Sequence, residues 1–314
     1  MAEARFAHLN TSSLTRFGDP GYRIPRGGLF LPFLLGLSAL WPSPPATAAT
    51  GTAADAIAEG DARYAARAAG AKGSVADPAA VDGAIAAYSR GLGLAPGDLA
   101  ARYKLLRALH YRGAFCGATL DEQKRIFDEG RRLGQEAVDR LEKMAGTARG
   151  AQRIAALRRE PHAAELYFWT AACWGQWALA RGKLAAARVG VSGRVRDLAQ
   201  TVLDLDPQLE DAGAHRILGR LHDQSPRIPL LTGWVSKRSA VEHLRQAHAI
   251  APTNAIGQFF LAEALLEHEP AHAEEARRLL AQCATQPPRP EYLVEDRHYA
   301  ELARARLEAL GNFR

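Results

Sequence analysis

The chain has 314 residues, of which 47% are hydrophobic and 24% are charged. This balance is typical of globular proteins and excludes an intrinsically disordered chain. Aromatic residues make up only 7%, and the sequence is rich in Ala, Leu, Arg and Glu. Because these side chains lose little conformational freedom in a helix, the composition favours an all-α protein.

The formal net charge is +6, from 40 Lys and Arg residues against 34 Asp and Glu residues. Charges of both signs are interspersed, and the sequence has no block of five or six basic residues. Binding to nucleic acid needs clustered Lys and Arg side chains. The charge pattern therefore predicts no nucleic-acid partner.

The first 48 residues have the pattern of a secretory signal peptide. An apolar segment over residues 27–41 follows two arginines and precedes the small sequence Ala-Thr-Ala at residues 46–48. This segment is too short to span a bilayer comfortably, and the small residues suit a cleavage site. We expect cleavage after Ala48 and an exported, periplasmic mature protein. The alternative is an uncleaved membrane anchor.

The rest of the chain contains an internal repeat. Ala240, Leu244, Ala247 and Pro252 follow one another at spacings of four, three and five residues. Small residues let two helices approach closely, the large residue fills the space between them, and proline ends the helix. This is the pattern of the second helix of a tetratricopeptide repeat. The same pattern recurs over residues 84–96 and 276–288, and a weaker copy lies over residues 195–207.

The intervening segments fit the first helix of each repeat, with Leu105, Leu218 and Leu261 at comparable positions. An insertion at residues 224–237 lengthens one repeat beyond the family period of about 34 residues. An opening helix at residues 53–70 and a closing helix at residues 291–310 complete the array. The sequence therefore predicts one all-α domain over residues 49–314, a tetratricopeptide-repeat α-solenoid of about five helix pairs plus a C-terminal helix.

Three stretches have a more specific character: AIAEGDARY at residues 56–64, LYFWTAACWGQW at residues 166–177, and the insertion at residues 224–237. Over about residues 53–310 the chain resembles the T-component family of TRAP transporters and, in fold, the regulator of microtubule dynamics proteins. The resemblance implies a periplasmic accessory protein of a carboxylate transporter, with a solute-binding protein as partner. The chain differs from lipid-anchored members in having no Cys directly after its apolar segment, where a lipid would be attached.

The first helices of such an array line its concave surface, where partners bind. Taking Trp169 as the large residue of its first helix, the repeat register predicts a groove with aromatic and arginine side chains. Such a groove suits an extended peptide, or a small carboxylate held by two arginines. The alternative is that Trp174 and Trp177 only pack in a nearly all-round apolar helix. The predicted groove residues are Tyr103, Arg107, His110, Tyr167, Trp174, Trp177, Arg216, Arg220, Phe259 and Glu263.

The insertion carries the apolar side chains of Ile228, Leu230, Leu231 and Trp234. Their apolarity argues against a free solvated loop, so we expect them to cover the groove or to mediate oligomerisation. The function expected from the whole sequence is a non-catalytic scaffold that binds a protein partner in the cell envelope. A purely structural homo-oligomer is an alternative.

One match to a catalytic pattern occurs, at residues 268–272 (His-Glu-Pro-Ala-His). The H-E-x-x-H pattern of zinc proteases needs both histidines on one face of a continuous helix. Pro270 lies between them, and the repeat register places the stretch in a turn. We therefore expect no metal here and no cofactor, and an envelope metallohydrolase using His268, Glu269 and His272 is the rival hypothesis.

No other enzyme motif is present: the sequence lacks Cys-x-x-Cys, Gly-x-Ser-x-Gly and a Gly-rich phosphate loop. We expect no catalytic residues. The odd number of cysteines leaves at least one thiol outside any intramolecular disulfide. Cys173 and Cys283 lie in apolar helical segments and are expected to be buried, whereas Cys116 has no such prediction.

Overall fold

A computed structural model describes residues 51–228 and 232–311, except for the side chain of Lys183. The predicted signal peptide over residues 1–48 lies outside this range. The described chain is helical, apart from one isolated β-bridge between Lys72 and Val75. Within these residues, no helix combines the length and apolarity needed to cross a bilayer.

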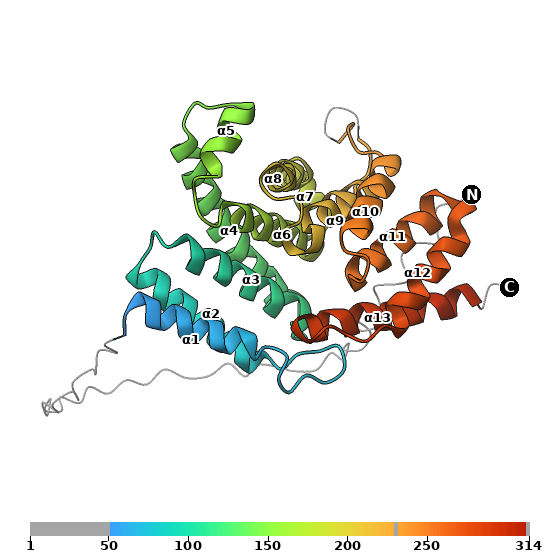
Figure 1. The fold of residues 1–314 in the computed structure, drawn as a ribbon, viewed down its shortest axis with the longest axis horizontal. Helices are drawn as coiled ribbons and strands as arrows, with labels where there is room; N and C mark the ends of the chain where they lie inside the picture. Colours follow the sequence, from blue (N-terminus) through green and yellow to red (C-terminus); the bar gives the residue numbers. More distant parts are fainter. Residues whose placement is uncertain (1–50, 229–231, 312–314) are drawn as a thin grey trace, which may run out of the picture. The chain divides into compact units, whose positions relative to one another are not determined.

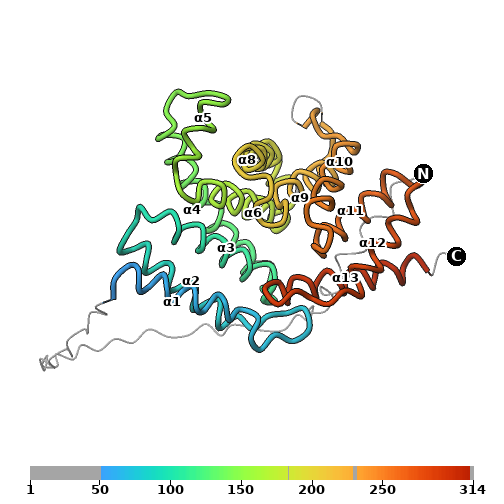
Figure 2. The backbone as a smooth tube through the Cα atoms, viewed as in Figure 1, coloured from blue at the N-terminus to red at the C-terminus, as the bar shows by residue number. Residues whose placement is uncertain are grey.

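The helices form five successive pairs followed by a closing helix (Figures 1 and 2). Each pair packs on itself and on its neighbours, and from the second pair onward the first helices of adjacent pairs also contact one another. The predicted all-α array of helix pairs is thereby confirmed. The helices are α1 (Ala53–Ala65), α2 (Pro78–Leu94), α3 (Leu99–Phe115), α4 (Leu120–Ala145), α5 (Gly150–Leu157), α6 (Ala163–Arg181), α7 (Lys183–Arg188), α8 (Val191–Leu205), α9 (Leu209–Gln224), α10 (Lys237–Ile250), α11 (Ala255–His268), α12 (Ala273–Thr285) and α13 (Leu293–Gly311), with 3₁₀ turns η1 (Pro270–His272) and η2 (Pro290–Tyr292).

The pairs are α1 with α2, α3 with α4, α6 with α8, α9 with α10, and α11 with α12, while α5 and α7 are short additions. Helix α9 ends at Gln224 and α10 begins at Lys237, so the insertion separates the two helices of one pair as predicted. The opening and closing helices also agree with the prediction to within a few residues.

Short polar side chains mark where many of these helices begin. The side chain of each accepts a hydrogen bond from a backbone N–H in the first turn, which would otherwise lack a partner. Thr52 and Thr119 also form capping boxes, with Asp55 and Glu122. The capping residues are Thr52, Asp77, Asp98, Thr119, Ser236 and Asn254.

Helix α4 is the second helix of its pair, although the repeat pattern did not identify it. It has 26 residues and ends at Gly146 instead of at a proline, so the spacing used for the other second helices is missing. Its contacts with α6 still depend on small residues. A Cβ atom on Gly134 would lie 2.4 Å from the hydroxyl oxygen of Thr170.

The start of α13 contacts the first helix pair as well as the last one. Glu295 forms an ion pair with Arg67 just beyond α1, and His298 packs edge-on against Phe115 of α3. Val294 is fully buried in the same apolar core as the first two pairs. Helix α13 therefore joins regions that lie more than two hundred residues apart in the chain.

Candidate functional site

The two arginines expected to clamp a carboxylate, Arg216 and Arg220, are bonded within their own helix. The Arg216 guanidinium donates to the backbone carbonyls of Glu210, at 2.8 Å, and of Asp211. Arg220 donates to the Asp223 carboxylate at 2.6 Å and stacks over the Phe260 ring. The structure therefore does not present them as a pair of free guanidinium groups.

Helix α13 packs on the predicted groove residues of α11. The ring of Phe259 lies 5.7 Å from that of Tyr299, measured between centroids. Glu263 accepts a hydrogen bond of 2.7 Å from Arg306. The closing helix of the same chain thus covers this part of the predicted concave surface.

The predicted groove residues of α3 also have partners within the chain. Tyr103 packs against the ring of His162, and Arg107 lies over the ring of Tyr64 at 4.2 Å. His110 is surrounded by aromatic rings, including that of Trp169 at 5.4 Å. Burial lowers the pKa of His110 to about 4.

A network of charges that the repeat pattern did not reveal lies at the start of α9. Asp211 accepts hydrogen bonds from Asn254, at 3.0 Å, and from Arg289, at 2.6 Å. Arg289 is also bonded to Asp296 of α13. The backbone of Glu210, Asp211 and Ala212 is left-handed, which costs free energy for residues other than glycine and is held here by these contacts. The network joins α9, α11 and α13.

Three more predicted groove residues, Tyr167, Trp174 and Trp177, lie on a different face of α6 from Trp169. Tyr167 donates a hydrogen bond to Glu142 of α4, and the indole N–H of Trp177 donates to Asp128. The guanidinium of Arg131 lies 4.9 Å from both tryptophan rings.

The ten predicted residues consequently do not form one surface. Trp174 and Trp177 are only 5% and 7% exposed, which agrees with the packing alternative. The assumed register placed this aromatic face of α6 beside Tyr103, Arg107 and His110, whereas the structure turns it toward α4 and α8.

An open groove of about 660 Å³ lies between α4, α5 and α8, with Tyr167 at its base; we call it the α4–α8 groove. At the base, Arg153 donates hydrogen bonds to Glu142, at 2.9 Å, and to Thr201, at 3.2 Å. The bond from Arg153 holds the pKa of the Glu142 carboxyl below its usual value. The groove is lined by Gln135, Val138, Glu142, Arg153, Tyr167, Gly190, Gly193, Arg194, Asp197, Leu198, Gln200, Thr201 and Asp204.

The walls of the α4–α8 groove carry amide and charged side chains. Arg194 donates a hydrogen bond of 2.6 Å to the amide oxygen of Gln135 and lies over the ring of Trp174. Gln200 and Asp204 stand one turn apart on α8, and their side chains are hydrogen bonded at 3.2 Å. Of all the lining residues, only Tyr167 was predicted. The others belong to helix faces on which the repeat pattern sets no residue type.

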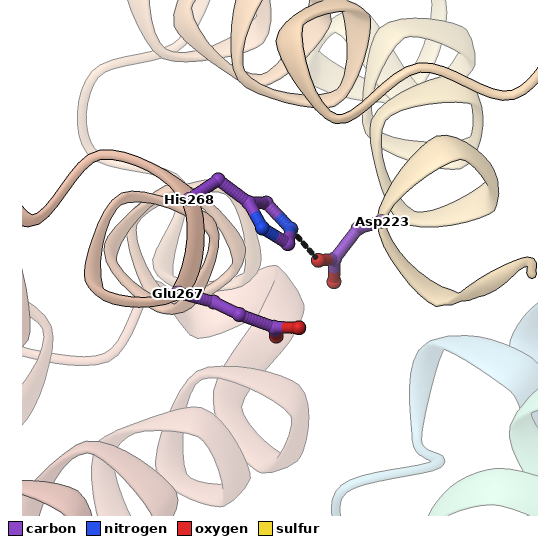
Figure 3. A group of neighbouring side chains, drawn as sticks. All are labelled: Asp223, Glu267 and His268. Atoms are coloured by element: carbon purple, nitrogen blue, oxygen red, sulfur yellow. Dashed lines mark hydrogen bonds and ion pairs between the residues drawn. The ribbon is translucent and has the colours of Figure 1, made fainter.

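The histidines of the H-E-x-x-H match point to different partners. His268 is the last residue of α11, and its Nε2 atom lies 2.8 Å from Asp223 of α9. His272 belongs to the 3₁₀ turn, and its Nδ1 atom lies 3.2 Å from Glu275. The break at Pro270 is as predicted. His268 instead joins Asp223 and Glu267 in a group whose ligand atoms lie within 4.8 Å of one another (Figure 3).

In the insertion, Trp234 packs on its own chain. Its ring meets that of His222 edge-on at 5.3 Å and lies under the guanidinium of Arg196. Ile228 is 37% exposed. Leu230 and Leu231 lie outside the described residues, so their predicted contacts stay predictions.

The three cysteines are buried, unpaired thiols. Cys173 and Cys283 are completely buried, as their apolar neighbours predicted. Burial raises the pKa of Cys116, Cys173 and Cys283 to about 12. Because the thiolate is the reactive form, these groups are poorly suited to nucleophilic chemistry.

No protein-family model matches this chain, and no curated protein matches it. Among solved structures it is similar to the crystal structure of the yeast Tom70, with 13% sequence identity, covering 85% of this chain and 67% of that chain. The TM-score is 0.27. This likeness is weak, and the fold of the described residues is defined by their own helix packing.

Proposed function

We propose that this helical scaffold is non-catalytic and binds an extended protein segment in the α4–α8 groove. The observation that carries the proposal is the open groove itself. It is open to solvent, and its α8 wall carries exposed amide and charged side chains, among them Gln200 and Asp204. On the predicted concave surface, Arg216 and Arg220 are hydrogen bonded within α9, and Phe259 is packed against Tyr299 of α13.

The side chains of the groove suit a polypeptide backbone. Gln200 is exposed, and its carbonyl oxygen and second amide N–H can pair with main-chain groups of a bound segment. The Gln135 amide already pairs with Arg194 and Asp139. Arg194, Asp197 and Asp204 all lie on α8 and supply charges of opposite sign for the side chains of the bound segment. An extended segment with charges of both signs fits this lining.

We also propose that the protein is exported and acts as an accessory component of a TRAP-type carboxylate transport system. The support is the signal-peptide pattern over residues 1–48 and the resemblance of residues 56–64, 166–177 and 224–237 to the T-component family. On this proposal the bound segment belongs to a solute-binding protein of the cell envelope.

Site-specific photocrosslinking in the producing cells tests the binding site. The photoreactive amino acid p-benzoylphenylalanine is placed at Gln200 on the wall of the groove and, as a control, at Arg238, which is 87% exposed on α10. We expect an adduct with one envelope protein from position 200 and none from position 238.

The protein in the adduct is identified by mass spectrometry. If it is a solute-binding protein, the result supports the role in carboxylate transport. The affinity of this protein for the purified chain is then measured for the wild type and for the double variant Gln200→Ala/Arg194→Ala. We expect the double variant to bind at least about tenfold more weakly, because several polar contacts are lost. Equal adducts at both positions, or unchanged affinity in the double variant, would refute the groove as the binding site.

A further inference from the structure

The side chains of Asp223, Glu267 and His268 converge at the place where two helices end (Figure 3). Asp223 lies in the last turn of α9, and Glu267 and His268 are the last two residues of α11. One carboxylate oxygen from each acid and one imidazole nitrogen lie within 4.8 Å of one another. Such a spacing allows a single ion to contact all three residues.

Asp223 is held in a fixed orientation. Its Oδ2 atom accepts hydrogen bonds from Arg220, at 2.6 Å, and from Gln224, at 2.7 Å. Its Oδ1 atom faces Nε2 of His268 at 2.8 Å. Carboxylates that bind metal ions are commonly positioned in this way by hydrogen bonds to the other oxygen.

Glu267 is exposed and has no ion-pair partner among the residues that the structure describes. The side chains of Asp223 and His268 are only 1% and 10% exposed. The group therefore has two sheltered ligands and one that faces solvent, from which an ion can enter. A cation between the two carboxylates also relieves their mutual repulsion.

We propose that Asp223, Glu267 and His268 bind a first-row divalent transition-metal ion, with Zn²⁺ as the best-suited member. One imidazole nitrogen and two carboxylate oxygens form a mixed donor set that such ions accept, with water completing the coordination. The set is too small for Ca²⁺, which takes six to eight oxygen ligands. The ion would tie the end of α9 to the end of α11 and so join two neighbouring helix pairs.

Titration of the chelator-treated full chain with Zn²⁺ alone tests this site by isothermal calorimetry. We expect one ion per chain and a higher melting temperature in its presence, because an ion that binds only the folded state stabilises it. Glu267→Gln and His268→Ala are each expected to lower the affinity at least about tenfold. Glu267 is exposed, so its variant keeps the fold, and circular dichroism checks both variants.

His272→Ala is the matched control, because His272 belongs to the H-E-x-x-H match but not to the proposed site. It is expected to leave the Zn²⁺ affinity unchanged. Absence of Zn²⁺ binding, or binding that survives both Glu267→Gln and His268→Ala, would overturn the proposal. Loss of binding in His272→Ala would also overturn it and assign the ion to the two histidines of the sequence match.

Discussion

His110 shows how one partly buried side chain, packed among aromatic rings, makes stability depend on pH. Its ring lies 6.4 Å from that of Phe127 and 5.4 Å from that of Trp169, measured between centroids. Burial among these rings disfavours the charged imidazolium and lowers the pKa to about 4, from an ordinary value of 6.5. In the unfolded chain the same group takes up its proton near pH 6.5.

We therefore expect His110 to lower the free energy of unfolding as the pH falls. Above pH 6.5 the group is neutral in both states, and between pH 6.5 and about 4 only the unfolded state gains the proton. The loss over this window is up to about 3 kcal/mol, at about 1.4 kcal/mol per pH unit. The free energy of unfolding is measured by urea denaturation at pH 7.5 and at pH 5. Its decrease between the two pH values should be smaller for His110→Phe than for the wild type.

His272→Ala provides the comparison for this measurement, because the His272 side chain is 50% exposed. Its pH dependence should match that of the wild type. Identical pH dependence in His110→Phe and the wild type would contradict the role assigned to the burial of His110.

Between helices, the repeat works through close contacts of small residues with large ones. Gly219 of α9 faces Leu244 of α10, which is the large residue of the repeat pattern. A Cβ atom at Gly219 would lie 2.5 Å from Cγ of Leu244 and 3.3 Å from the carbonyl oxygen of Ala240. The first of these distances is far below van der Waals contact, so the two helices would have to move apart.

Gly219→Ala is accordingly expected to destabilise the protein by about 1–3 kcal/mol, as overpacking in a tight core does. Gly175→Ala is the matched control, because Gly175 is also inside a helix but no atom beyond its chain neighbours and its own helix backbone lies within 4 Å of the added Cβ. That substitution should stabilise the protein by about 0.5–1 kcal/mol, through the higher helix propensity of alanine. Chemical denaturation measures both, and equal effects of the two substitutions would contradict this account.

For the molecule as a whole, the contact of α13 with the first helix pair links the two ends of the array. Arg67 and Glu295 form an ion pair at 3.4 Å with side chains 12% and 9% exposed. The guanidinium also lies over the Tyr64 ring at 4.6 Å. Burial raises the pKa of the Glu295 carboxyl, although Arg67 opposes this shift.

Removing one member of this buried pair should be costly. Glu295→Ala leaves the Arg67 charge buried without its partner, so we expect a loss of about 3–5 kcal/mol in the free energy of unfolding. Hydrogen exchange should speed up in both α1 and α13, because the contact joins them. The exposed pair Arg238 and Glu242 is the control, and Glu242→Ala should cost no more than about 1 kcal/mol. Faster exchange in α13 alone would show that this pair does not couple the two ends.

The sequence by itself determined the helix pairs, the insertion at residues 224–237 and the break at Pro270. These features depend on local rules: small and large residues at helical spacing, and proline at or near a helix end. Helix α4 was not predicted from this pattern, because it ends at Gly146 without a proline. The local pattern therefore predicts where most helices lie.

Only the tertiary structure decided which faces of those helices meet. Two residues such as Tyr167 and Trp169 differ by about 200° around a helix, so a small error in register assigns a side chain to the opposite face. The contact of Arg67 with Glu295, and that of Asp223 with His268, join residues far apart in the chain. Their meeting depends on how successive helix pairs stack, which no local spacing specifies.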